Sequence, residues 1–339
     1  MELSTIKLAK KLSPYTRVIV IAKENGFIAK NSNEYVGGNI SLEKISFRSS
    51  LSLSIILKTR DIIKKYNIKN VIFFGASELK SLYFSFLYFD INLIIRHGTT
   101  KTKSKKNGFR RLIYNRVNYH VSTSKHIFNN VQKIIPFGKA TKECIIYPSI
   151  KYSPSQNSND SNDIRLLHTG RITEGKGQLD AIKACKTLVE NDIYFYFNIV
   201  GGYENEKDKD IFLDFYKTVS YKNSINITGH VDNVIDFIEH SNIFIFPSYG
   251  EGFGNSFVEA LSAGLVCICY ENTTFKEFKK LGFYMHIVED RSINKLQEKL
   301  LYVAQNIAYE KEKSKKNIDL VKTLFNEEKE TKKYLDILQ

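Results

Sequence analysis

The chain has 339 residues, of which 42% are hydrophobic, and this is enough for two large cores and excludes a disordered protein. Its net charge of +14 is unevenly placed, because residues 1–150 carry 26 Lys and Arg against 8 Asp and Glu, whereas residues 151–339 are slightly acidic. Such asymmetry predicts an anionic partner for the first half: nucleic acid, a membrane surface or a phosphorylated ligand.

No apolar run reaches the length of a membrane-spanning helix, and the first residues, MELSTIKLAKKL, are too charged for a signal peptide. The four cysteines lack the paired spacing of zinc sites, which agrees with a reducing compartment. We therefore expect a cytoplasmic protein.

Short apolar segments alternate with amphipathic ones through residues 1–150, which predicts a doubly wound α/β domain. The expected strands are residues 17–22, 70–74, 91–96, 119–124 and 143–148. His97 follows the third of these strands and precedes Gly98, at the edge where open α/β sheets bind ligands. A purely structural histidine is the alternative.

The run KTKSKKNGFRRLIYNR, residues 101–116, contains seven cations and no acid, with Phe109 and Leu112 among them. One end of this run is predicted to form a basic amphipathic helix that docks on an anionic membrane. A solvated loop and an RNA-binding segment are the alternatives, although the run lacks the several aromatic residues of a stacking platform. The residues expected to face the membrane or the acceptor are Lys103, Lys105, Lys106, Arg110 and Arg111.

Residues 151–163 are polar and rich in Ser and Asn, so they are predicted to link two domains. A second α/β domain is expected over residues 164–325, and a C-terminal helix over residues 326–339 is expected to pack on the first domain. The expected strands of the second domain are residues 164–169, 194–200, 225–228, 243–247, 266–270 and 285–289. Two such domains place a cleft between the carboxyl ends of their sheets, where we expect the ligands.

The segment HTGRITEGKGQLDAI, from His168, connects the first strand of this second domain to a helix. Gly170 follows the strand, and Arg171 and Lys176 flank the turn. Two cations beside a helix N-terminus suit a diphosphate group. Exposed cations in a solvated loop are the alternative.

A second strand–loop–helix junction is PSYGEGFGNSFVEA, residues 247–260. Its glycines permit tight turns and close approach of a ligand, and the amides of residues 254–256 open a helix that can bind an anion. Glu251 on the loop is placed to accept hydrogen bonds from sugar hydroxyls, and Glu259 to hold the two hydroxyls of a ribose. These parts fit a nucleotide sugar; a loop and a helix-surface glutamate without function are the alternative.

With these two segments and the His97–Gly98 pair, the chain resembles the retaining nucleotide-sugar glycosyltransferases of GT-B fold, family 4, also called glycosyl transferases group 1. The match is close over residues 247–260, covers most of the chain, and is strong from about residue 164 to 290. The resemblance implies two Rossmann-like domains, the first binding the acceptor and the second binding the donor. It implies catalytic roles for His97, Arg171, Lys176 and Glu251, and donor contacts from Gly170, Arg171, Lys176, His230, Val231, Glu251, Gly252, Phe253, Gly254, Asn255, Ser256 and Glu259.

The implied reaction moves a hexose or N-acetylhexosamine from a UDP- or GDP-linked donor to an acceptor hydroxyl, with retention of configuration. The expected acceptor is a lipid-linked glycan in the synthesis of O-antigen, capsule or lipopolysaccharide, reached from the inner face of the cell membrane. No cofactor is expected. Asp208 and Asp210 resemble a metal-binding Asp-x-Asp motif, but they lie at a helix start, where capping charge explains them better, so we predict no metal site.

The chain departs from the family pattern at its beginning, because the usual first strand and its glycine-rich loop have no counterpart before residues 2–12. That strand is normally central to a doubly wound sheet. We therefore expect its neighbours either to close up or to leave an unpaired gap.

Two other classes of function remain open at this point. One is a non-catalytic GT-B scaffold that binds membrane or nucleic acid through its basic first half, with the two-glutamate loop arguing against it. The other is a sugar phosphorylase or an epimerase on the same scaffold, since fold does not fix function.

Overall fold

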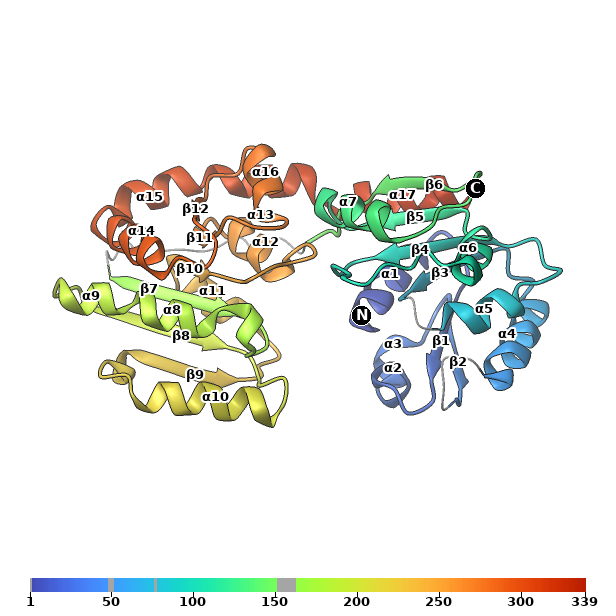
Figure 1. Ribbon diagram of the computed structural model, residues 1–339, viewed down its shortest axis with the longest axis horizontal. Coiled ribbons are helices and arrows are strands. Elements are labelled where there is room, and N and C mark those ends of the chain that lie inside the picture. Colours follow the sequence, from blue (N-terminus) through green and yellow to red (C-terminus); the bar gives the residue numbers. More distant parts are fainter. Residues whose placement is uncertain (1, 48–51, 76–77, 151–162) are drawn as a thin grey trace. The chain divides into compact units, whose positions relative to one another are not determined.

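The computed structural model describes residues 2–47, 52–75, 78–150 and 163–339 (Figure 1). These residues form two compact units. Unit 1 runs to Pro148 and also contains Glu327–Gln339, and unit 2 comprises Ser149–Asn326. Of the predicted linker, residues 151–162 lie outside the described residues.

Unit 2 contains one sheet of six parallel strands in the order β12-β11-β10-β7-β8-β9. The chain starts at the centre with β7, moves outward through β8 and β9, and returns to begin the other half at β10. The strand order therefore reverses between β7 and β10, and this is the switch point of a doubly wound sheet. The strands are β7 (Ile164–Thr169), β8 (Phe195–Val200), β9 (Ile225–Gly229), β10 (Ile243–Phe246), β11 (Val266–Tyr270) and β12 (His286–Val288).

The core of unit 2 lies on both faces of this sheet, because β10 and β11 are buried at every residue. Continuous apolar runs are typical of strands covered on both faces, so the predicted doubly wound α/β fold is confirmed here. The helices of unit 2 are α8 (Gln178–Ala184), α9 (Lys186–Glu190), α10 (Glu206–Lys217), α11 (Ile235–Glu239), α12 (Asn255–Ser262), α13 (Phe275–Lys280), α14 (Ile293–Gln305), α15 (Ile307–Ser314) and α16 (Lys316–Leu324).

Unit 1 contains two parallel sheets, β1-β2 and β3-β4-β5-β6. All five strands expected from the sequence are present, and β2 is an additional one. The strands are β1 (Val18–Lys23), β2 (Ile40–Ile45), β3 (Asn70–Phe74), β4 (Asn92–His97), β5 (Tyr119–Ser122) and β6 (Lys142–Ile145). The helices are α1 (Glu2–Leu12), α2 (Phe27–Lys30), α3 (Ser32–Tyr35), α4 (Leu53–Tyr66), α5 (Leu79–Ser85), α6 (Gly108–Tyr114), α7 (Lys125–Ile134) and α17 (Glu327–Leu338).

In the described part of unit 1, β1 and β3 belong to separate sheets and do not pair. Of the two expected arrangements of these strands, the described residues have the unpaired gap. Helix α1 packs on both sheets, since Ile6 and Ala9 join the core of β1 and β2, while Leu8 and Leu12 join that of β4 and β5. The two sheets are thus held together by helix packing and not by a continuous hydrogen-bond ladder.

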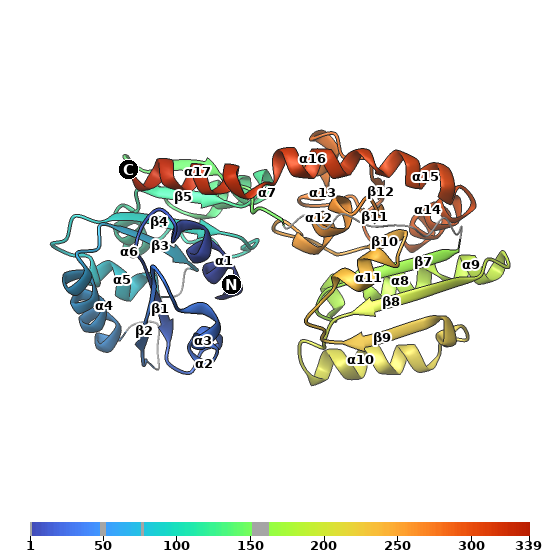
Figure 2. The same ribbon diagram turned by 180° about the vertical axis from the view of Figure 1, so that it is seen from behind.

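The C-terminal helix α17 belongs to unit 1 and lies beside β5 in both ribbon views (Figures 1 and 2). Its Tyr334 is fully buried with Leu8 and Leu12 of α1, and Glu330 pairs with Lys11. The side chains of Asn70 and Asn92 donate to the last carbonyl groups of the helix, at 3.0 and 2.7 Å. These contacts satisfy acceptors that a helix C-terminus leaves open.

Within the described residues, no helix is both long enough and apolar enough to cross a membrane.

Candidate active site

The two loops singled out by sequence leave neighbouring strands at the switch point of unit 2. Residues 170–177 follow β7, and residues 247–254 follow β10. Because β7 and β10 are paired and parallel, both loops emerge at the same carboxyl edge of the sheet. Open α/β sheets bind their ligands at such a point.

Lys176 and Glu251 meet between these loops. The Nζ of Lys176 lies 2.7 Å from Oε1 of Glu251, and the same oxygen accepts a hydrogen bond of 2.9 Å from the hydroxyl of Ser248. The backbone N–H of Glu251 donates to the hydroxyl of Thr273 at 3.0 Å. Glu251 is buried and Lys176 is half-buried. Two side chains that are 75 residues apart in the chain therefore form one ion pair. Hydrogen bonds to Ser248 and Thr273 fix the position of Glu251 in this pair.

The approach of the two loops depends on Gly177. Its φ of +75° is left-handed, and a Cβ at this position would lie 2.0 Å from the carbonyl oxygen of Pro247. The loops are also joined by a backbone hydrogen bond of 2.9 Å from Tyr249 to Gly175. A residue with a side chain at position 177 would have to push the loops apart.

His168, inside β7, supports the turn that carries Lys176. Its Nε2 donates to the carbonyl oxygen of Lys176 at 2.9 Å, and its ring packs on Phe246 with centroids 4.9 Å apart. Burial lowers the pKa of His168 to about 4, so the ring is neutral at physiological pH. Sequence reasoning assigned His168 no role, because the residue that it positions is identified only by the folded turn.

Helix α12 begins directly after the glycine loop. Gly254 precedes it in a left-handed conformation, with φ +80°, and the first amides of the helix have no acceptor within it. The side chain of Phe253 is buried against Phe278 and Phe325, so this residue offers a ligand its backbone and not its ring. Glu259 is half-buried on the second turn of the helix. Gly252 and Ser256 are half-buried and Asn255 is exposed.

The remaining residues predicted to contact a donor lie apart from the Lys176–Glu251 pair. Gly170 is the first residue of the loop after β7, with open space where a side chain would be, and the exposed Arg171 pairs with Glu204. His230 and Val231 follow β9, the outermost strand on that side, and the ring of His230 is 84% exposed. The structure therefore brings together Lys176 and Glu251, and leaves Arg171 and His230 accessible along the same carboxyl edge.

His97 is at the end of β4 in unit 1, where its side chain is only 1% exposed. Its Nε2 lies 2.7 Å from Nδ1 of His120, and its Nδ1 lies 3.0 Å from Nζ of Lys101. Burial holds the pKa of His97 well below its ordinary value, and the charges of Lys101, His120 and Lys105 lower it further. Both ring nitrogens are therefore engaged by side chains of the same unit, which favours a supporting role for this histidine.

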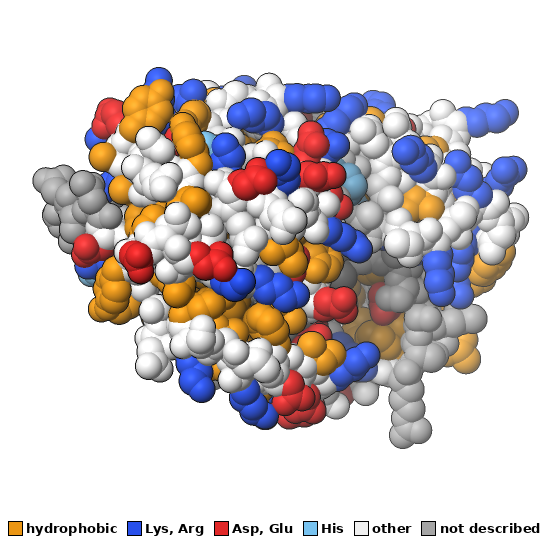
Figure 3. Space-filling view, turned by 60° about the vertical axis from the view of Figure 1, so that its left-hand side comes forward, with side chains coloured by type: hydrophobic (Ala, Val, Ile, Leu, Met, Phe, Trp, Pro, Cys, Tyr) orange, Lys and Arg blue, Asp and Glu red, His pale blue; other side chains and the backbone are white. Residues whose placement is uncertain are grey.

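The basic run after His97 divides into two sets. Lys103, Lys106 and Arg111 are exposed, whereas Lys105 and Arg110 are half-buried. The predicted amphipathic helix forms as α6, begun by Asn107, whose side chain accepts from the amide of Arg110 at 3.0 Å. Phe109 and Leu112 on this helix are 48% and 52% exposed. At the right of Figure 3, over unit 1, the charged side chains in view are mainly Lys and Arg.

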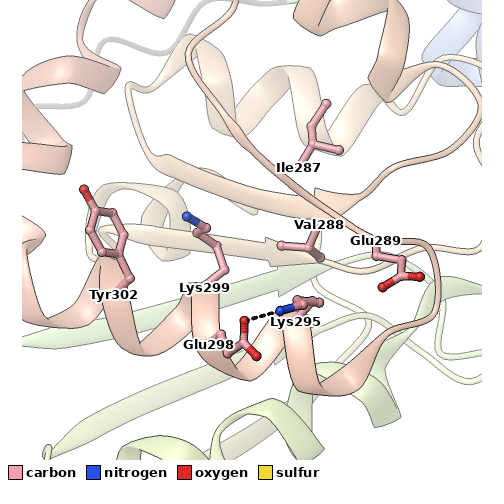
Figure 4. A pocket seen from close by; sticks show the side chains of 7 residues that line it. All are labelled: Ile287, Val288, Glu289, Lys295, Glu298, Lys299 and Tyr302. Atoms are coloured by element: carbon pink, nitrogen blue, oxygen red, sulfur yellow. Dashed lines mark hydrogen bonds and ion pairs between the residues drawn. The ribbon is translucent and has the colours of Figure 1, made fainter.

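A pocket of about 340 Å³ lies elsewhere in unit 2, between the edge strand β12 and helix α14 (Figure 4). Its lining includes the Lys295–Glu298 pair, at 2.8 Å, and none of the residues predicted from sequence. Asp208 lies in the first turn of α10, where its amide donates to the capping side chain of Asn205. Among the described residues, no three metal-binding side chains lie close enough together to hold an ion.

Part of the chain matches a known protein family. Residues 150–330 match the family described as Glycosyl transferases group 1. The chain is 27% identical over 133 residues to the capsular polysaccharide biosynthesis glycosyltransferase CapM of Staphylococcus aureus, covering 39% of this chain and 34% of that protein. It is 26% identical over 129 residues to the UDP-Gal:alpha-D-GlcNAc-diphosphoundecaprenol alpha-1,3-galactosyltransferase of Escherichia coli, covering 35% of this chain and 33% of that protein.

The matched segments thus span about a third of the length of these curated relatives. The fold extends further than the sequence similarity. A glycosyltransferase structure from Rickettsia africae ESF-5 superposes with a TM-score of 0.83, covering 99% of this chain and 94% of that one at 18% identity. Likeness at this level of identity shows a shared GT-B fold.

Proposed function

Because the chain belongs to the Glycosyl transferases group 1 family, we propose that it is a retaining glycosyltransferase of family 4 that uses a nucleotide-diphosphate sugar. The observation that carries this proposal is the Lys176–Glu251 pair at the switch point of unit 2, next to the first amides of α12. A cation, a supported carboxylate and free amides together match the diphosphate and hydroxyl groups of such a donor.

Each part of the site has a role in holding the donor. The amides of residues 254–256 and the cations Arg171 and Lys176 bind the diphosphate, and Glu259 accepts hydrogen bonds from the ribose hydroxyls. Glu251 accepts hydrogen bonds from hydroxyls of the transferred sugar while it orients Lys176. His168 keeps the turn at Lys176 in place. The main catalytic contribution is positioning and stabilisation of charge on the leaving diphosphate.

The proposed chemistry is a front-face substitution. The bond between the anomeric carbon and the diphosphate oxygen breaks, and the acceptor oxygen bonds to the same carbon from the same face. The acceptor proton passes to an oxygen of the departing diphosphate. Lys176 and Arg171 supply the positive charge that this leaving group needs, so no metal ion is required in this proposal.

The donor and acceptor are proposed by chemical class. We propose a hexose or N-acetylhexosamine linked to UDP or GDP, and an acceptor hydroxyl on a lipid-linked glycan. The names of the two curated relatives support this choice, since one makes capsular polysaccharide and the other transfers galactose from UDP to a diphosphoundecaprenol-linked sugar.

A panel of nucleotide sugars, assayed with lipid-linked acceptors and product mass spectrometry, tests the proposal. Transfer of one mass-defined sugar, with an α-linked product from an α-linked donor, is the expected result. If no donor is bound or consumed while anionic vesicles or nucleic acid are bound, the chain is a non-catalytic scaffold.

Replacing Glu259 with alanine is expected to weaken binding of the donor nucleotide by about tenfold or more, because charge-assisted hydrogen bonds to the ribose are lost. Isothermal calorimetry with UDP and GDP measures this affinity. Glu239 on α11 is the control position, and its alanine variant should bind like the wild type. An unchanged affinity in a folded Glu259→Ala protein would remove this residue from the donor site.

We propose that the exposed cations of the basic run dock unit 1 on the inner face of the cell membrane. Lys103, Lys106 and Arg111 attract anionic headgroups, and the exposed rings and chains of Phe109 and Leu112 enter the interface. Each cation near such a surface contributes about 1 kcal/mol. Neutralising all three should therefore reduce binding to phosphatidylglycerol vesicles by about 100-fold.

Co-sedimentation with vesicles at low and high salt measures this binding, which should require the anionic lipid and fade with salt. Nucleotide affinity serves as the internal control, because the donor site is in unit 2. A wild-type protein that ignores anionic vesicles at low salt would refute membrane docking.

A further inference from the structure

Four half-buried cations gather at the carboxyl edge of the larger sheet of unit 1. Lys80 is in the first turn of α5, after β3, and Lys101 and Lys105 follow β4. Arg110 is in the first turn of α6. Open α/β sheets bind ligands at this edge, and none of these side chains takes part in the donor site of unit 2.

The positive charge of this cluster, which we call the unit 1 cation cluster, has no carboxylate partner among the described residues. Burial lowers the pKa of Lys105, and the charges of Arg110 and Lys80 lower it further. Burial and then the charge of Lys105 also lower the pKa of Lys101 to about 8. Like charges that are partly withdrawn from water repel each other, which is unfavourable in free energy. A bound anion would lower this unfavourable free energy.

Lys101 is held in position on both its backbone and its side chain. Asn130 of α7 accepts from its amide and donates to its carbonyl group, each at 2.9 Å. The ammonium group donates to Nδ1 of His97, which leaves the Nε2–H of His97 to donate to His120. This pattern requires neutral imidazoles, and burial holds the pKa of both rings low, to about 3 for His120.

The neutral histidine pair therefore orients Lys101 without cancelling its charge. An ammonium group has three hydrogens, and His97 accepts one of them. The remaining donors of Lys101 are available to a ligand. Arg110 already donates one hydrogen bond of 3.3 Å from Nη1 to the carbonyl oxygen of Ser104, and its other guanidinium donors remain for a ligand. Fixed cations with spare donors are the usual recognition chemistry of phosphate groups.

We propose that the unit 1 cation cluster binds the phosphate groups of the acceptor, so that this enzyme selects acceptors whose sugar is carried on a phosphate or diphosphate. The inference rests on the proposed function, because it assigns the acceptor to unit 1. Membrane headgroups meet the exposed Lys103, Lys106 and Arg111, whereas the cluster is half-buried beside the histidine pair. A neutral glycan would leave these charges unmatched.

Binding of inorganic pyrophosphate tests the cluster directly, by calorimetry in an Arg171→Ala, Lys176→Met background that removes the proposed diphosphate ligands of unit 2. Adding Lys80→Ala and Lys105→Ala should weaken pyrophosphate by about 100-fold, since each charged contact is worth about tenfold. The matched control is Lys58→Ala with Lys64→Ala, which removes two exposed cations of α4 and should change affinity by less than about twofold.

The variants are expected to fold, because removing like charges relieves repulsion, and a thermal midpoint at or above that of the parent protein confirms it. Lys101→Met keeps the apolar stem and should weaken pyrophosphate by about tenfold on its own. If the Lys80→Ala, Lys105→Ala and the Lys58→Ala, Lys64→Ala proteins lose pyrophosphate affinity equally, the attraction is a general property of the basic surface and the proposal is overturned. Unchanged affinity in the Lys80→Ala, Lys105→Ala protein would overturn it as well.

Two further measurements distinguish an acceptor phosphate from a lipid headgroup as the ligand of the cluster. They also distinguish failure of this proposal from failure of the proposed glycosyltransferase function. In otherwise wild-type protein, Lys80→Ala with Lys105→Ala should raise KM for a sugar-diphosphate-lipid acceptor and leave KM for the donor unchanged. The same variant should still bind phosphatidylglycerol vesicles; loss of vesicle binding with full pyrophosphate affinity would make the cluster a headgroup site instead. Failure of every donor to react would overturn the proposed function alone, because pyrophosphate binding needs no transfer.

Discussion

Replacing Lys176 with methionine is expected to lower kcat by about 10²–10³, with a smaller effect on donor affinity. The reason is that negative charge on the leaving diphosphate is greatest in the transition state, and one preorganised donor at such a position is worth this much. The substitution also leaves Glu251 buried without its cation, 2.7 Å from where the ammonium group was. Steady-state kinetics with the donor found in the nucleotide-sugar panel, together with calorimetry, separates the two effects.

The control for this experiment is Lys186→Met, which removes a lysine paired only with Glu190 on the surface of α9. Its kcat should equal that of the wild type. Arg171→Ala should also lower kcat, but less, because Arg171 is exposed and its charge is screened. EDTA should leave wild-type turnover intact if these cations provide the counter-charge. Normal turnover in a folded Lys176→Met, Arg171→Ala protein would remove both residues from the reaction.

The second large effect is expected from Gly177→Ala, which should destabilise unit 2 by about 2–5 kcal/mol and abolish donor binding. A left-handed backbone costs a residue with a Cβ about 1–2 kcal/mol, and overpacking adds about 1–3 kcal/mol. The new methyl group would lie 2.0 Å from the carbonyl oxygen of Pro247, so the loop that carries Glu251 would have to move. Thermal unfolding and nucleotide calorimetry measure the two consequences.

Gly175 provides a matched control in the same turn. A Cβ at this position meets no atom within 4 Å, and the backbone is not left-handed. Gly175→Ala should therefore leave the free energy of unfolding within about 0.5 kcal/mol of the wild type. If the two alanine variants behave alike, close contact at Gly177 does not set the geometry of the site.

The second half of the fold could be predicted from sequence because its strands are short, continuous apolar runs that end in glycine or a polar turn. Strand β2 was not predicted, since its sequence, ISLEKI, contains Glu43 and Lys44 and has no continuous apolar character. The helix expected after the Arg171–Lys176 turn is divided at Cys185 into α8 and α9.

The sequence was enough to predict which residues belong to the candidate site, but not which of them contact one another in the folded protein. The strand–loop–helix pattern indicated that Lys176 and Glu251 lie at one sheet edge, but the pattern does not contain the strand order that makes their loops neighbours. The burial of His97 depends on His120 and Lys101, which a sequence pattern does not connect. Likewise, the basic run looks uniform in sequence, and only the folded loop separates its exposed cations from its half-buried ones.

The return of α17 to unit 1 has a consequence for the order in which the protein is made. Unit 2 is one continuous stretch of chain, so all of its strands and helices are translated before α17. Unit 1 is synthesised first, yet it brings Lys11 into contact with Glu330, 319 positions later, and its core is closed by Tyr334. Domains generally fold as their chains emerge, N-terminal ones first. Here the apolar side of α1 that packs on Tyr334 stays uncovered until α17 has been made, so unit 2 is the first unit whose residues are all available.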